Sequence, residues 1–195
     1  MKKNNKAFWE GRYLEGRTGW DIGQPAPALI EYAGQLPEKS LPILMPGAGR
    51  GYEAEYLFRE GFSNLTVIDI AHAPLQALRE RVPDFPEHQL VEMDFFAYEG
   101  GPFDLVLEHT FFCALPPGMR PAYAEKMADL LRPGGKLAGL LFDFPLTDEG
   151  PPFGGSEAEY RKLFSPYFYL HTLERASNSI PPRAGKELFF IFEKK

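Results

Sequence analysis

The sequence predicts a single α/β domain built around a mainly parallel sheet. Three observations support this class: short apolar runs alternate with helical patterns, a glycine-rich turn follows the first run, and acidic residues follow the next two. The chain has 195 residues, of which 44% are hydrophobic and 25% charged, which suffices for one sizeable core. We therefore expect one domain over residues 1–195, with no repeat or linker dividing it.

Each expected strand is a short apolar or β-branched run bounded by turn residues. Such runs lie at 41–45, 65–70, 89–93, 103–107, 136–142, 168–174 and 187–192. Helical patterns begin near Gly51 and cover 74–81, 121–131 and 157–164. The RPGG turn at 132–135 is expected to stop the third of these helices before the next strand. No long helix separates the last two strands, which predicts an antiparallel hairpin at the sheet edge.

Charge and cysteine content restrict the partner and the compartment. The net charge of −6 argues against a generally basic surface for nucleic acid. Cys113 is the one cysteine, so no internal disulfide is possible, and no apolar signal-peptide core precedes Arg17. The longest apolar run, 137–142, is too short to span a membrane. We expect a cytoplasmic protein, a monomer or weak dimer, whose partner is a small molecule.

The glycine-rich turn indicates a nucleoside ligand. Gly47, Gly49 and Gly51 stand between the first strand and its helix, where missing side chains let a ligand approach the backbone. Asp69 ends the second strand about twenty residues later, the position from which a carboxylate takes the hydroxyls of a ribose. A purely structural tight turn is the alternative.

Two further residues bear on which nucleoside is bound. A dinucleotide fingerprint needs its third glycine at position 52, but Tyr52 stands there and its ring would crowd a pyrophosphate. Asp94 and Phe95 follow the third strand, where a carboxylate can accept from an adenine amino group and a ring can cover the base. This pattern favours S-adenosylmethionine over a nicotinamide cofactor. The structural alternatives are a loop cap for Asp94 and a core residue for Phe95.

Six segments spread along the chain form a specific pattern: WDIGQPAP (20–27), MPGAGRGYE (45–53), VIDI (67–70), MDFF (93–96), FDLVLEHTFFCALPP (103–117) and GPPF (150–153). In these segments the chain resembles the thiopurine S-methyltransferase superfamily, and most closely its halide and thiol methyltransferase branch. The resemblance implies a three-layer, doubly wound Rossmann-like methyltransferase fold with seven strands, the last antiparallel. It also implies methyl transfer from S-adenosylmethionine to a thiol, thiopurine or halide by in-line displacement. A nicotinamide-dependent oxidoreductase and an inactive cofactor-binding module remain the alternatives.

The same resemblance implies a set of site residues. Cofactor contacts fall on Trp9, Tyr13, Trp20, Gly47, Gly49, Asp69, Asp94, Phe95 and His109. Tyr13 departs from the tryptophan of the halide branch, and His109 from the tyrosine of that branch and the arginine of the thiopurine branch. Residues 1–40 would form a helical lid segment over a cofactor-binding core at 41–195. Trp9 and Tyr13, four residues apart, share one helix face, and aromatic rings attract a sulfonium; anchoring of the helix is the alternative.

The acceptor site is expected to be apolar and to contain few acid–base groups. Its predicted walls are Trp20, Phe111, Phe112 and Phe153. His109, beside Glu108 at a strand end, is the candidate catalytic residue and would help to deprotonate a neutral thiol. Arg183 is expected to contact an anionic or aromatic acceptor, and Cys113 to be an apolar filler. His72, His88 and His171 lack ligand spacing, so no metal site is expected.

Overall fold

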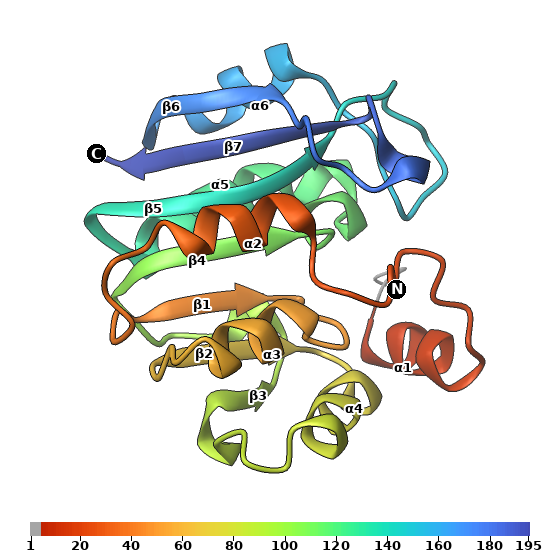
Figure 1. The fold of residues 1–195 in the computed structure, drawn as a ribbon. Helices are drawn as coiled ribbons and strands as arrows, with labels where there is room; N and C mark the ends of the chain where they lie inside the picture. Colours follow the sequence, from red (N-terminus) through yellow and green to blue (C-terminus); the bar gives the residue numbers. More distant parts are fainter. Residues whose placement is uncertain (1–4) are drawn as a thin grey trace.

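The computed structural model describes residues 5–195 and shows a seven-stranded sheet (Figure 1). The strand order is β3-β2-β1-β4-β5-β7-β6. The strands are β1 (Ile43–Pro46), β2 (Leu65–Asp69), β3 (Leu90–Glu92), β4 (Phe103–His109), β5 (Leu131–Phe142), β6 (Phe168–Arg175) and β7 (Glu187–Lys194). Strands β1 to β5 pair in parallel, whereas β7 runs antiparallel to both β5 and β6. The predicted edge hairpin and antiparallel last strand are confirmed.

Helices cover both faces of this sheet. They are α1 (Lys6–Leu14), α2 (Pro27–Gly34), α3 (Tyr52–Arg59), α4 (His72–Arg81), α5 (Arg120–Leu130) and α6 (Glu157–Phe164). Side chains alternate along a strand, so Leu44 packs in the core beneath α5 and α6, while Ile43 and Met45 pack beneath α2, α3 and α4. Because both faces are buried, the central strands consist of continuous apolar runs. The doubly wound, three-layer α/β class is confirmed.

The order of the strands places a crevice at the carboxyl ends of β1 and β4. Chain connections run outward from β1 in one direction and from β4 in the other, which leaves the ends of these two strands uncovered by a crossover. Helix α1 lies beside this end of the sheet (Figure 1) and contributes no fully buried residue of its own. The helix therefore borders the crevice rather than the core.

Helix α2 is an element that the sequence patterns did not single out. Its residues Ala28, Leu29, Tyr32 and Ala33 are buried against the sheet and α3. Within residues 5–40, the helix α1 and the loop that follows it border the crevice, while α2 belongs to a core layer.

Two predicted boundaries differ from the structure. Strand β5 begins at Leu131, because the RPGG turn lies inside it as an irregularity: Phe103 pairs with Leu131, but Leu105 pairs with Lys136. Helix α4 begins at His72, two residues before the predicted start. Its N-cap residue, Ala71, has no capping side chain, and Glu10 of α1 accepts from the His72 amide at 2.6 Å instead. The pairing of Phe103 with Leu131 and the capping of α4 by Glu10 both join distant parts of the chain, so local sequence patterns do not predict them.

Candidate active site

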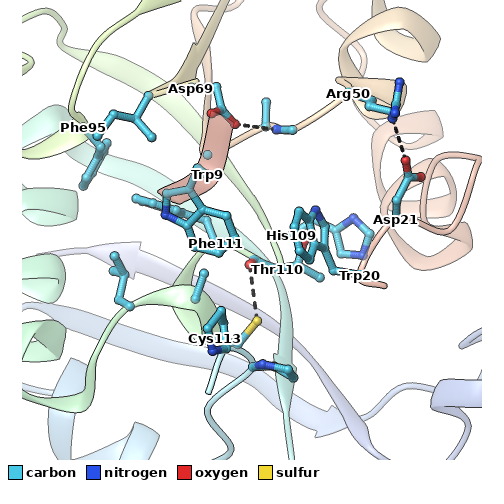
Figure 2. Close-up of a pocket in the computed structure, with 18 of the residues that line it drawn as sticks. Trp9, Trp20, Asp21, Arg50, Asp69, Phe95, His109, Thr110, Phe111 and Cys113 are labelled. Carbon is cyan, nitrogen blue, oxygen red and sulfur yellow. Dashed lines mark hydrogen bonds and ion pairs between the residues drawn. The ribbon is translucent and has the colours of Figure 1, made fainter. Parts of the chain in front are cut away.

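A cavity of about 470 Å³ occupies the crevice at the carboxyl ends of the parallel strands. Figure 2 shows side chains from three elements around it: Trp9 of α1, Asp69 of β2 and His109 of β4. All of the predicted cofactor-contact residues line it: Trp9, Tyr13, Trp20, Gly47, Gly49, Asp69, Asp94, Phe95 and His109. The structure therefore brings together residues that are up to 100 positions apart in the chain. The volume of the cavity is typical of small-molecule pockets.

The glycine turn presents backbone to this cavity because side chains do not fit there. Gly47 and Gly49 have φ of 57° and 55°, values that L-residues rarely adopt. A Cβ on Gly47 would lie 2.2 Å from the Phe111 ring, and one on Gly49 would lie 2.9 Å from the Tyr13 hydroxyl. The turn is thus a cradle closed by rings, into which only glycine fits.

Asp69 ends β2 with a buried carboxylate at the floor of the turn. Its Oδ2 accepts from the Gly49 amide and its Oδ1 from the Ala71 amide, both at 2.9 Å. Burial raises the pKa of Asp69 to about 6, although the two amide bonds favour the ionised form. The side chain is a charged hydrogen-bond acceptor held in a fixed position at neutral pH.

Three aromatic rings cover one side of the cavity. Trp9 and Tyr13 each meet the Trp20 ring edge-on, with centroid distances of 5.4 and 5.6 Å. Burial raises the pKa of Tyr13 above its usual value, so the phenol stays neutral. Polar contacts outside the cavity hold α1 in place: Glu10 caps α4, and Lys6 pairs with Glu92.

Asp94 and Phe95 line the cavity and also have structural partners. Asp94 accepts from the Phe96 amide at 3.0 Å and so caps the short helix η2 (Phe95–Ala97). The Phe95 ring is 3% exposed and packs on Phe111 and Tyr123. Asp94 is therefore a helix cap and Phe95 a core residue, and both also line the cavity.

His109 has a charged partner on each ring nitrogen. Its Nδ1 lies 2.8 Å from Oε1 of Glu53, which follows the glycine turn in α3, and its Nε2 lies 3.1 Å from Nη1 of Arg183. Burial alone would raise the pKa of Glu53, but His109 and the Ala26 amide outweigh that effect and lower it. The expectation of a site poor in acid–base pairs is wrong, because folding joins Glu53 to His109.

Arg183 is a buried cation at the same place. It lies in the short helix η5 (Pro181–Arg183), donates from Nη2 to the Trp20 carbonyl at 2.6 Å, and pairs with buried Glu187 at 3.3 Å. Glu53 and Glu187 were missed in the sequence. An acid in the first turn of a helix usually serves that helix, and an acid at the first residue of a strand usually faces water, so neither position carries a signal.

Glu108 does not act with His109, although the two are neighbours in β4. Its carboxylate accepts from the Phe111 and Phe112 amides and from the Tyr123 hydroxyl, at 2.6 to 2.9 Å. Burial raises its pKa. Adjacent strand residues point to opposite faces, so Glu108 supports the loop after β4 while His109 faces the cavity.

Two of the expected acceptor walls are core residues instead. Phe111 and Trp20 line the cavity, but Phe112 packs against Tyr123, Tyr160 and Phe164. Phe153 is buried and does not line the cavity, although Pro151 and Pro152 do. The short helix η3 (Phe112–Ala114) directs successive rings to opposite sides, which the run of phenylalanines does not reveal.

Cys113 lines the cavity as a neutral thiol. Its Sγ donates to the Thr110 carbonyl at 3.3 Å (Figure 2), and burial raises its pKa above the usual value. Within residues 5–195 no group of histidine, cysteine and acidic side chains is arranged to hold a metal ion. Nor does this part of the chain contain a helix with the length and apolarity to cross a membrane.

Comparison with known proteins now decides the family. A sequence model of thiopurine S-methyltransferases matches residues 4–194. The chain belongs to the thiopurine S-methyltransferase family. A probable thiol methyltransferase 2 of Arabidopsis thaliana is 32% identical over 96% of this chain and 84% of its own length. Thiocyanate methyltransferase 1 of Brassica oleracea is also 32% identical, over 92% and 81%, and a Vibrio cholerae thiopurine S-methyltransferase is 26% identical over 80% and 79%.

Solved structures agree on the fold of this family member. The Burkholderia thailandensis 1,6-didemethyltoxoflavin-N1-methyltransferase, solved with S-adenosylhomocysteine, has a TM-score of 0.76 at 20% identity, over 97% of this chain and 87% of its own. The magnesium protoporphyrin IX methyltransferase of Synechocystis, solved with its methyl donor, has a TM-score of 0.72 at 14% identity, over 97% and 95%.

This member of the family is therefore an S-adenosylmethionine-dependent methyltransferase that acts on small nucleophiles. Its cavity suits that cofactor, since a glycine cradle, a buried carboxylate and three rings match a nucleoside that bears a sulfonium. The nicotinamide-dependent and inactive alternatives are set aside.

Proposed function

We propose that this methyltransferase acts on small sulfur nucleophiles in their anionic form, such as thiolates and thiocyanate. The observation that carries the proposal is the buried Arg183 guanidinium, which lines the cavity beside His109. The two relatives at 32% identity, named as thiol and thiocyanate methyltransferases, support this acceptor class. The acceptor is the small-molecule partner of the enzyme.

We assign the cofactor to the residues around the glycine turn. Asp69 would take the ribose hydroxyls, Asp94 and Phe95 would flank the adenine, and Gly47 and Gly49 would give backbone contact. Trp9, Tyr13 and Trp20 would cover the sulfonium with their rings. When bound, S-adenosylmethionine supplies an activated methyl group on a positively charged sulfur.

The acceptor chemistry then requires mainly position and charge. The acceptor sulfur forms a bond to the methyl carbon as the bond from that carbon to the donor sulfur breaks, and the bonding pair returns to the donor sulfur. Arg183 favours the anionic acceptor and lowers the pKa of a bound thiol. The apolar wall, which includes Phe111, Leu115 and Phe142, removes water from the nucleophile. A thiolate needs no base, so His109 serves here as a partner of Arg183.

A panel assay tests the acceptor class. We expect the highest kcat/KM among bisulfide, thiocyanate and aryl thiolates, with iodide and 6-mercaptopurine as the competing acceptors. In Arg183→Met, the KM for the best anionic acceptor should rise about 10-fold while the cofactor Kd stays within about twofold. Arg183→Lys should raise the acceptor KM less than Arg183→Met does, because the positive charge remains.

Arg175→Met is the matched control, because Arg175 is an exposed arginine whose partners, Asp143 and the Gly185 carbonyl, lie outside the cavity lining. Faster methylation of a phenol or an amine than of any sulfur anion would refute the proposal. So would an Arg183→Met enzyme that folds, binds the cofactor and keeps the KM of wild type. Thermal melting of each variant separates these results from loss of the fold.

A further inference from the structure

The imidazole of His109 is clamped between a carboxylate and a guanidinium. Glu53 Oε1 lies 2.8 Å from Nδ1, and Arg183 Nη1 lies 3.1 Å from Nε2. The side chains of His109 and Glu53 are 13% and 15% exposed, and Arg183 is 11% exposed, so little water competes for these contacts. The two contacts therefore hold the ring by both of its nitrogens.

The contacts fix where the proton of the ring lies. A guanidinium has only donors, so Nε2 can accept from Arg183 only while the ring proton lies on Nδ1, the nitrogen that faces Glu53. The ring proton therefore lies on Nδ1 and points to Glu53, whose lowered pKa keeps it ionised at neutral pH. The other charged groups around this ring are Glu187, which pairs with Arg183, and Glu108, the chain neighbour.

Glu53 also ties this group to the rest of the pocket. The same Oε1 accepts from the Ala26 amide at 3.0 Å, just before α2. Glu53 itself stands in the first turn of α3, directly after the glycine turn. One carboxylate therefore joins the start of α2, the glycine turn and the end of β4.

We propose that Glu53 is a positioning residue for the methyl acceptor. By holding the proton on Nδ1 of His109, it leaves Nε2 as the acceptor that sets the direction of the Arg183 guanidinium. The inference rests on the proposed function, in which Arg183 holds the anionic acceptor. Glu53 acts through His109 and Arg183, and the expected effect falls on acceptor binding rather than on cofactor binding.

The variant pair Glu53→Gln and Glu53→Met tests this role. Glutamine keeps an oxygen that accepts from Nδ1–H, so acceptor KM should stay within about threefold of wild type. Methionine fills the space without that acceptor, so acceptor KM should rise about 10-fold with cofactor Kd unchanged. In ¹⁵N-histidine NMR spectra, His109 should show the Nδ1–H tautomer in wild type and Glu53→Gln, and lose that preference in Glu53→Met.

Glu55→Gln is the control, since Glu55 lies in the same helix turn but pairs with Arg59 and Arg81 outside the cavity. A rise in cofactor Kd without a rise in acceptor KM would overturn the inference and make Glu53 a cofactor ligand. An unchanged tautomer in Glu53→Met would also overturn it. If the tautomer changes but neither Glu53→Met nor Arg183→Met affects acceptor KM, the proposed function fails instead.

A second pair of variants, at His109, tests the inference even if Glu53→Met does not fold. In His109→Gln, the side-chain oxygen reaches the place of Nε2 and still accepts from Arg183, whereas the shorter side chain of His109→Asn reaches only the place of Nδ1. We expect His109→Gln to keep an acceptor KM at least about fivefold lower than that of His109→Asn. Equal values for the two variants would contradict the inference.

Discussion

Two groups of residues in the cavity are built in different ways. The glycine-turn group, Gly47, Gly49, Asp69, Asp94 and Phe95, consists of backbone and of side chains at or shortly after the ends of strands. The arginine group, Glu53, His109, Arg183 and Glu187, joins four elements through charged contacts. The first group is set by where parallel strands end, while the second exists only once distant elements have packed. Mutations in the glycine-turn group should therefore weaken cofactor binding without changing acceptor KM, and mutations in the arginine group should do the opposite.

The largest effect is expected from Asp69→Asn. Loss of a charged acceptor for two ribose hydroxyls should weaken cofactor binding about 100-fold, as measured by isothermal titration. At saturating cofactor, acceptor KM should stay within about twofold, because Asp69 makes no contact with the arginine group. Asp84→Asn, an exposed acid after α4, is the control. A parallel rise in acceptor KM would show that the groups are not separable.

In the wild-type enzyme, a lower pH should weaken cofactor binding through the glycine-turn group. The pKa of Asp69 is about 6 in the folded protein, above its usual 3.8, because of burial. The folded state thus binds this proton more tightly than the unfolded state, so the contribution of Asp69 to stability falls as pH rises through that window. Cofactor affinity, which uses the ionised form, should change in the opposite direction and be about 10-fold weaker at pH 5 than at pH 7.5. The Asp69→Asn variant should lose this dependence; an identical slope in both proteins would assign it to another group.

The smallest effect is expected at the aromatic cover, which lies beside the glycine-turn group. Trp9→Ala removes one ring that meets Trp20 edge-on, so cofactor Kd should rise about fivefold in the same titration. Phe8→Ala removes the next ring of α1, which packs on Trp9 but does not line the cavity, and it should have less than half that effect. Similar losses in both variants would mean that the rings only anchor the helix.

Most of the fold was predictable from local patterns. The central strands are apolar runs closed by turns, so their order along the chain and the antiparallel edge pair followed from spacing alone. The start of α4 was not predictable, because Glu10 caps it from another helix. Helix α2 was missed because a short apolar segment between prolines and glycines resembles a loop in sequence.

The site divides in the same way. Asp69 and Gly47 could be placed in the cavity because a strand end and a tight turn have fixed geometry. Phe112 was misplaced because two adjacent rings do not reveal which of them faces the core, and Phe153 because the conformation of a proline- and glycine-rich segment is not fixed locally. Glu53 was missed because its partner, His109, lies 56 residues away in the chain.

The sequence by itself determined the α/β class, the glycine cradle and the carboxylate at the end of β2, since each depends on backbone geometry within a few residues. Only the tertiary structure decided the contacts of the arginine group, the packing of α2 into the core and the side to which each ring turns. The physical reason is that charge pairing and side-chain burial depend on the separation of atoms in space, which local sequence does not fix. The acceptor chemistry proposed for this enzyme therefore rests on contacts that form only when the chain folds.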